Sequence, residues 1–536
     1  MYLEQSRTSS GVKKAFAWLN AHALHVILGI YCVAGLTFAL FGNSNRDEGW
    51  YLYASRLVYE GKIPYKDFPY FQMPLLPYIY GLPQLLFGPS LLVGRLTSFA
   101  FSLITVGVGL RLAQRMAGRT AALLFLALTF LNLDAMWTYT TTRTEPLVTP
   151  LVMLSLFFLL KERRSTTDLV LAPSLLLWAT AVRLTAAPAF VAVLAFCLYQ
   201  ARKNRNQWDA ILIWTGLQVV LLVVVPLLLT QDKFVFNVWT SQVFRGGQLG
   251  ETQAPLGAML RDKALFFSTF YAGYPLTAIL SLGAALYLAV LWRGGWRPSI
   301  AKLGEYPTAN LGMLALAGLT FLPHLAISTI AQVYFITAFA ILTLMASITV
   351  VKAASAVPRT GALGVSFVVG GLLLFGTLSI AHDFPGAINT VYPSLHEYSQ
   401  MGDYLNAVVP PDKQILTFDV SVAIAANRDV APGLEMSDVS YWPVLRTDRA
   451  KHYGVVDYEL LQEIAADKKT AAIVIGAWDP GLIMRGMTSP PAVVTDDRAE
   501  AVLALFPRSA DEYRLARVFP GHGHWGGDYL VFLRND

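Results

Sequence analysis

The sequence predicts an α-helical polytopic membrane protein that ends in a soluble α/β domain. Hydrophobic residues make up 55% of its 536 residues and charged residues only 14%, whereas soluble domains carry about 25% charged residues. Apolar runs of about 20 residues, long enough to cross a bilayer, recur between short polar breaks. These runs are continuous rather than alternating in polarity, which favours transmembrane helices over a β-barrel.

From these runs we expect about eleven transmembrane helices. Their expected ranges are 22–42, 89–111, 120–138, 146–160, 167–182, 184–200, 208–230, 264–291, 308–326, 331–350 and 361–381. The stretch 167–200 is too long for one helix, and Arg183 with Pro188 predicts a break into two short helices. No small-residue cleavage site follows the first run, so we expect an anchor and not a removed signal peptide.

The basic residues between the runs predict how the chain is oriented. Five basic clusters fall on the side of the N-terminus, at residues 111–119, 161–164, 202–205, 292–302 and 352–359. Lysine and arginine gather in cytoplasmic loops, so we expect this side to be cytoplasmic. The outer side then receives residues 43–88, 139–145, 231–263, 327–330 and everything after about residue 382. We therefore expect a multi-pass protein of the cytoplasmic (inner) membrane, with its C-terminal domain periplasmic or extracellular.

From residue 384 the composition changes to that of a soluble domain. "KQILTFDV" and "TAAIVIGAWDP" predict strands, and "RLARVFPGHGHWGGDYLVFLR" predicts a terminal hairpin. The chain thus divides into a membrane domain, 1–383, with an outer interfacial loop at 43–88, and a small α/β domain, 384–536. In the hairpin turn, His522 and His524 lack spaced acids, so we expect no metal site there.

Charge and cysteine usage exclude two further classes. The net charge of +6 is scattered between the apolar runs, which indicates membrane topology and no nucleic-acid partner. Cys32 and Cys197 both lie inside apolar runs, so a disulfide framework is not expected.

The stretch "NRDEGWYLYA" sets Asp47 and Glu48 side by side where the first transmembrane helix should have ended. One interpretation is that both acids cap the next helix, and the other is that they form half of an active site. The following "EGWYLYASRLVYEG" has aromatic and aliphatic residues at helical spacing, which predicts an interfacial helix on the membrane surface. Gly61 and Pro64 should end this helix.

A second outer loop, "TYTTTRTEP", presents Arg143 and Glu145 directly before another apolar run. Pro146 suits the first turn of a helix, and Glu145 would complement the helix dipole there. An arginine inside an apolar hairpin, such as Arg183, needs a functional reason or must snorkel to the interface.

In this order, the features resemble the GT-C class of polytopic glycosyltransferases, particularly the protein O-mannosyltransferase and lipid A aminoarabinose transferase branch. The resemblance is carried by "DEGWYLYASRLVYEGKIPYKDFPYFQMPL", the acid in "RTEP", the helix pair "PHLAISTIAQVYFITAFAIL" and the outer domain, and it covers effectively the whole chain. It implies inverting transfer of a monosaccharide from a polyprenyl-phosphate donor to an acceptor on the outer face. It also implies that no metal or other cofactor is required, although some relatives bind divalent ions.

The resemblance further implies roles for individual residues. Asp47 corresponds to the general base on the acceptor hydroxyl, Glu48 to its neighbour in the acid pair, and Glu145 to the second-loop acid near the reaction centre. The related aminoarabinose transferases carry a lysine before the first-loop proline, where this chain has Gln72 and Met73. Other residues must therefore bind the donor phosphate or lipid, and the candidates are Arg183, Arg143, Arg95, Arg56, His324, Gln332 and Tyr334. The expected acceptor-binding residues are Tyr53, Tyr78 and Gln72.

Other functions stay open from the sequence alone. A transporter or flippase would place charges inside several spans, and here charges avoid the span centres. A polymerase of lipid-linked glycans shares the architecture, but would normally lack the "DEGWYLYA" loop, and a scaffold would leave that aromatic loop unexplained. The sugar is not determined, and the acceptor could be a glycan, a glycolipid or a protein.

Overall fold

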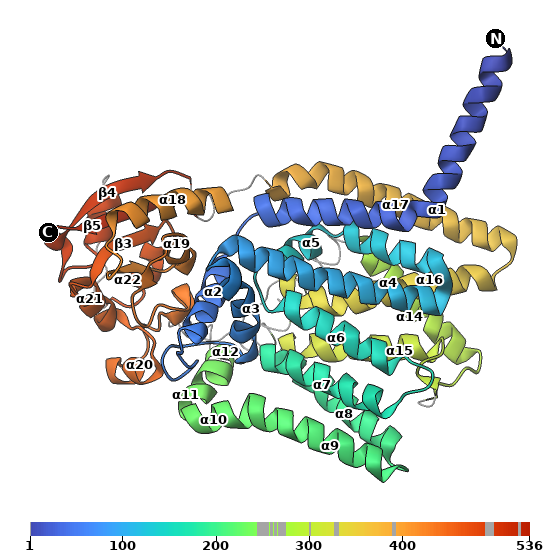
Figure 1. Cartoon of the computed structure of the whole chain (residues 1–536), viewed down its shortest axis with the longest axis horizontal. Helices are drawn as coiled ribbons and strands as arrows, with labels where there is room; N and C mark the ends of the chain where they lie inside the picture. The colour runs from blue at the N-terminus through green and yellow to red at the C-terminus, as the bar shows by residue number, and fades with distance from the viewer. Residues whose placement is uncertain are drawn as a thin grey trace.

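The computed structural model describes residues 2–243, 275–299, 302–325, 332–388, 393–487, 498–521 and 527–535, with a few single residues between these ranges. A bundle of helices and a smaller domain with a β-sheet lie side by side, and helices α2 and α3 lie between them (Figure 1). Six described segments are long and apolar enough to cross a membrane: His22–Phe41, Leu91–Phe130, Leu184–Ala201, Arg205–Thr230, Thr308–Leu325 and Val333–Ala356. Five shorter apolar helices accompany them: Leu75–Phe87, Glu145–Leu159, Thr166–Val182, Ile279–Arg293 and Leu363–Leu378.

The bundle is built from these helices in chain order. Its elements are α1 (Tyr2–Phe41), α4 (Leu91–Phe130), α5 (Leu133–Thr140), α6 (Glu145–Leu159), α7 (Thr166–Val182), α8 (Ala187–Ala201), α9 (Arg205–Val219), η2 (Val220–Val224), α10 (Val225–Thr230), α14 (Pro275–Arg293), α15 (Thr308–Phe321), α16 (Ile336–Ala356) and α17 (Arg359–Ile388). Within the Val333–Ala356 segment that contains α16, the apolar window is 83% buried, so this segment is the centre around which the others pack.

Helix α4 covers two of the expected spans. Both expected helices, 89–111 and 120–138, are present, because a non-helical residue inside α4, Gly118 with φ 81°, separates them. That backbone conformation is readily available only to glycine. The expected helix 120–138 then ends early, because Asn132 accepts a hydrogen bond from the Ala135 N–H (2.8 Å) and caps a new helix, α5.

The break at Arg183 is confirmed. Helix α7 ends at Val182, Arg183 has an extended backbone with φ −147° and ψ 118°, and a short 3₁₀ turn, η1 (Leu184–Ala186), leads into α8. The side chain of Arg183 is paired with Glu145 inside the protein, so it does not need to snorkel to the membrane interface.

Helix α2 (Arg46–Tyr59) confirms the expected helix after the acid pair, and its end at Glu60 is followed by Gly61 with φ 88°. Its aromatic side chains, however, are covered by other parts of the protein. The aromatic side chains of Trp50, Tyr51 and Tyr53 are at most 4% exposed, because α2 packs against α3 (Leu75–Phe87), α4 and the C-terminal domain at once.

The C-terminal domain is a mixed sheet with helices, as its strand patterns predicted. Its elements are α18 (Leu395–Val408), β1 (Gln414–Thr417), α19 (Val420–Ala425), β2 (Asp429–Val430), α20 (Thr447–Tyr453), α21 (Tyr458–Ala466), β3 (Thr470–Gly476), α22 (Asp479–Met484), α23 (Arg498–Leu503), β4 (Tyr513–Phe519) and β5 (Tyr529–Arg534). The strand order is β2-β1-β3-β5-β4. Strands β2, β1 and β3 are parallel, and the terminal hairpin β4–β5 joins β3 antiparallel.

Candidate active site

A cavity of about 330 Å³ lies where helix α2, the start of α6 and the break between α7 and α8 meet. We call it the central cavity. Two further segments close it, the turn from η3 (Phe236–Thr240) into α12 (Ser241–Val243) and the 3₁₀ turn η7 (Gln332–Phe335). Two acids and two arginines from three separate stretches of the sequence line it: Asp47, Arg143, Glu145 and Arg183.

Asp47 lies in the first turn of α2 and faces the central cavity. Its Oδ2 pairs with Arg143 Nη2 at 2.8 Å, and its Oδ1 accepts a hydrogen bond from the Trp50 indole N–H at 3.2 Å. The Asn45 side chain caps this helix turn by accepting from the Asp47 N–H. The side chain of Asp47 is still 26% exposed, so it is oriented by two donors and yet accessible from the cavity.

Glu145 and Arg183 form the second acid–arginine pair. Arg183 Nη1 forms an ion pair with Glu145 Oε1 and also donates to Thr144 Oγ1 at 3.0 Å. Its guanidinium lies 4.4 Å from the centre of the Tyr334 ring, a cation–π distance. Arg143 Nε lies 3.8 Å from Glu145 Oε2, so the four groups form a chain of alternating charges along the cavity wall.

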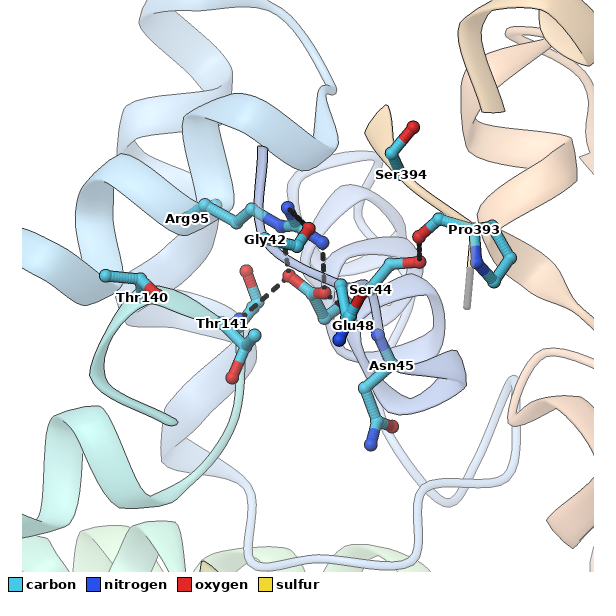
Figure 2. A network of polar contacts seen from close by, with 12 residues as sticks. Gly42, Ser44, Asn45, Glu48, Arg95, Thr140, Thr141, Pro393 and Ser394 are labelled. Atoms are coloured by element: carbon cyan, nitrogen blue, oxygen red, sulfur yellow. Dashed lines mark hydrogen bonds and ion pairs between the residues drawn. The ribbon is translucent and has the colours of Figure 1, made fainter. Parts of the chain in front are cut away.

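Glu48 is adjacent to Asp47 but does not line the central cavity, and its carboxylate turns toward Arg95 (Figure 2). Arg95 donates to both of its carboxylate oxygens, at 2.9 and 2.8 Å, and the Thr142 N–H donates to it at 3.1 Å. Arg95 also donates to the carbonyls of Ala39 and Gly42, at the end of α1. We call this group, Glu48 with Arg95, the buried anchor, because their side chains are at most 1% exposed.

The buried anchor corrects two expectations. Glu48 does not line the central cavity, so it cannot contact a sugar there, and it caps α2 by accepting from the Asn45 N–H. Arg95 is enclosed by the bundle and is not available to a donor phosphate, nor does it snorkel outward. Its role is to join α1, α2, α4 and the turn before α6.

Three other expected site residues also lie away from the central cavity. Arg56 pairs with Glu60 and with Asp429 of the C-terminal domain, at 2.6 and 2.7 Å. The buried Tyr53 hydroxyl accepts from the Val430 N–H at 3.1 Å, and Tyr78 is 43% exposed on α3 outside the lining residues. These positions support neither phosphate binding by Arg56 nor acceptor binding by the two tyrosines.

The remaining expected residues lie in or beside the central cavity. Gln72 and Tyr334 line it. His324 stacks on Tyr334 with ring centres 5.1 Å apart, and its neighbour Pro323 is a lining residue. Gln332 begins η7, but its side chain lies outside the described residues, as do His522 and His524. Among the residues that the structure does describe, no three His, Cys, Asp or Glu side chains group as metal ligands.

The sequence did not indicate the part of the cavity wall that is formed by α2 and by the turn from η3 into α12. Trp50, Tyr51, Trp239 and Gln242 all line the central cavity. Trp239 is 59% exposed and lies in a π-helical turn, a conformation often found at functional sites. In the sequence these aromatic residues look like ordinary interface anchors, and only the fold shows which of them meet Asp47.

Comparison with known proteins agrees with this architecture. The family model of the dolichyl-phosphate-mannose-protein mannosyltransferases matches residues 69–229, less than a third of the chain. Among curated protein sequences, none matches. The crystal structure of ArnT from Cupriavidus metallidurans in the apo state has a TM-score of 0.56 at 13% identity, and the match covers 97% of this chain and 98% of that one. The same protein bound to undecaprenyl phosphate has a TM-score of 0.52 at 13% identity, with 94% and 97% covered.

These similarities extend over nearly the full length of both chains. They confirm that this protein has the GT-C fold that its sequence motifs indicated. Together with the long apolar helices, the fold makes it a multi-pass membrane protein.

Proposed function

We propose that this protein is a membrane glycosyltransferase that moves a monosaccharide from a polyprenyl-phosphate carrier to an acceptor hydroxyl, with inversion. The observation that carries the proposal is Asp47, an accessible carboxylate held beside two arginines in one cavity. The match to the mannosyltransferase family model and the undecaprenyl phosphate bound by ArnT support a lipid-phosphate donor.

Asp47 is the general base in this proposal. The acceptor oxygen attacks the anomeric carbon, the bond from that carbon to the phosphate oxygen breaks on the opposite face, and its electron pair leaves with the phosphate. The acceptor proton passes to the Asp47 carboxylate, so the products are the glycosylated acceptor and the free polyprenyl phosphate. Glu145 is less suited to this task, because its side chain is 4% exposed and paired with Arg183.

Arg183 and Arg143 supply the cationic charge that the leaving phosphate requires. Both line the central cavity, and a guanidinium matches phosphate oxygens with two parallel hydrogen bonds. Gln72 and Met73, which stand where related aminoarabinose transferases carry a lysine, line the same cavity. The positive charge of that lysine is therefore supplied by Arg183, at the break between α7 and α8.

Since two arginines provide the positive charge, we expect sugar transfer to persist in EDTA. Assaying the EDTA-treated protein checks this expectation.

The topology completes the proposal. We place the N-terminus in the cytoplasm, because the basic loops share its side of the cytoplasmic (inner) membrane. The central cavity and the C-terminal domain then face outward, with residues 1–383 forming the catalytic membrane domain and 384–536 the outer domain. The acceptor is a glycan, a glycolipid or a protein that reaches the cavity from that side.

The test is transfer of radiolabel from polyprenyl-phosphate sugars to a membrane extract by the purified full-length protein. Wild type should label an acceptor, and Asp47→Asn should lose about 10²–10⁴-fold in rate, the usual contribution of a general base. Glu60→Gln is the matched control, because Glu60 follows the same helix outside the cavity. If no donor yields labelled product with wild type, or if Asp47→Asn is as active as wild type, the proposal is wrong.

A further inference from the structure

Helix α2 presents one of its faces to the C-terminal domain. Arg46, Gly49, Tyr53 and Arg56, spaced three or four residues apart, share that face, which we call the domain face. Arg46 Nη2 pairs with Asp479 Oδ1 at 2.9 Å. Arg56 Nη2 pairs with Asp429 Oδ1 at 2.7 Å near the other end of the helix.

Between these two ion pairs the helix touches the backbone of the domain. A Cβ on Gly49 would collide with the backbone nitrogen of Ser421, so glycine permits this close approach. The Tyr53 hydroxyl accepts a hydrogen bond from the Val430 N–H at 3.1 Å. The domain face is therefore in contact along almost the whole length of α2.

The partners of the domain face lie at one edge of the sheet. Asp479 follows β3, Ser421 follows β1, and Val430 is the last residue of β2, so α2 crosses the carboxyl ends of three parallel strands in their spatial order. Strands β1 and β3 are neighbours whose following connections leave in opposite directions. In α/β domains the crevice at such a point is where ligands bind. Here α2 occupies it, and in Figure 1 this helix lies between the sheet and the bundle.

The Arg46–Asp479 pair is the more buried of the two ion pairs. Asp479 is fully buried, and its second oxygen accepts from the Gly476 N–H at 2.7 Å, at the end of β3. Asp429, in contrast, has a side chain that is 58% exposed. The sheet thus holds the first turn of α2 through a buried pair and the last turn through an exposed one.

The first turn of α2 also carries Asp47, whose carboxylate turns toward the central cavity. Arg46 is its direct neighbour in the chain, whereas Arg56 lies about 15 Å further along the helix axis, at 1.5 Å per residue. A catalytic group displaced by about 1 Å can lose about 100-fold in rate. The attachment of Arg46 therefore bears directly on where the carboxylate of Asp47 lies.

We propose that Arg46 and Asp479 are positioning residues for Asp47, and that the C-terminal domain uses the carboxyl edge of its parallel strands to hold the catalytic helix. This inference rests on the proposed function. It assigns the outer domain a part in the reaction even though none of the described residues from 393 onward lines the central cavity.

The test compares Asp479→Asn with Asp429→Asn in the full-length protein, using the labelled-donor assay. Asp479→Asn should lower kcat about 10- to 100-fold and leave the donor KM within about twofold, because the arginines of the cavity are untouched. Asp429→Asn, which breaks the other contact of the same helix with the same domain, should keep kcat within about twofold. Arg46→Gln should behave like Asp479→Asn, and Arg46→Lys, which keeps the charge, should recover part of kcat.

Hydrogen–deuterium exchange gives a readout that does not depend on activity. Asp479→Asn should speed exchange of the amides in the first turn of α2, and Asp429→Asn only of those in the last turn. If Asp479→Asn fails to fold, Arg46→Gln serves in its place. Equal losses of kcat in the two aspartate variants, or an Asp479→Asn kcat within twofold of wild type, would overturn the inference while Asp47→Asn still tests the reaction. If wild type transfers no sugar, exchange still shows whether the domain holds the helix, and the proposed function alone fails.

Discussion

Asp47 and Glu48 are neighbours in the chain, and each pairs with an arginine at 2.8 Å, yet their surroundings differ completely. Glu48 and Arg95 are sealed inside the bundle with their hydrogen bonds filled by backbone groups, whereas Asp47 and Arg143 border a cavity. Removing one partner of a buried ion pair leaves an uncompensated buried charge, so Glu48 and Arg95 depend on each other structurally. An accessible pair keeps a carboxylate oriented and still able to take a proton. The difference shows that burial and partners, rather than residue type, separate the anchor from the candidate base.

The largest expected effect comes from exchanging the two acids for their amides. Asp47→Asn should lower the transfer rate about 10²–10⁴-fold with little change in melting temperature, because its side chain is partly solvated. Glu48→Gln should instead lower stability by about 3–5 kcal/mol, since it leaves Arg95 as an uncompensated buried charge. Thermal melts and initial rates on the same preparations check both expectations. If Glu48→Gln melted like wild type but lost its activity, the two acids would have to exchange roles.

A third acid, Glu435 in the C-terminal domain, tests the effect of burial outside the membrane. Burial raises the pKa of the Glu435 carboxyl from its ordinary 4.5 to about 7. Between these values the folded protein keeps the proton and the unfolded chain has lost it, so stability should fall as pH rises from about 4.5 to 7. Glu435→Gln should remove this dependence and gain up to about 3 kcal/mol at pH 7.5. Melting temperatures measured across this window check it, with Glu463→Gln, whose side chain is 51% exposed, as control.

A smaller effect is expected from replacing the arginines by lysine. Arg183→Lys should raise the donor KM about tenfold, because lysine lacks the planar fork and its stacking on Tyr334. Arg95→Lys should lower the melting temperature and leave the donor KM of the folded protein unchanged, since Arg95 does not line the cavity. Donor titrations on both variants check the contrast. A KM that rises equally in both would mean that the anchor, too, acts on donor binding.

Much of the architecture could be predicted because local sequence determines it. The apolar runs specify the membrane helices, and the break at Arg183 follows from an arginine and a proline in an overlong run. Helix α2 could be predicted from the helical spacing of its aromatic and aliphatic residues and from the glycine after it. Its burial could not be predicted, because the C-terminal domain that covers it begins more than 300 residues later in the chain. The same limit applied to Arg95 and Arg56, which were candidates for the donor phosphate beside the more strongly indicated Arg183 and have entirely different partners.

By itself, the sequence determined that the protein is polytopic and helical and that a C-terminal α/β domain follows the membrane helices. It also placed Glu145 close to Arg143, at the start of a helix. These features depend on length, polarity and helix signals, which act over short distances. Only the tertiary structure decided that Asp47 and not Glu48 faces the cavity, and that Arg143 and Arg183 meet there. It also decided that α2 lies across the edge of the sheet and that Asp479 holds its first turn there. The physical reason is that adjacent residues on a helix point about 100° apart. What each side chain meets therefore depends on helices and strands that the chain brings together from distant positions.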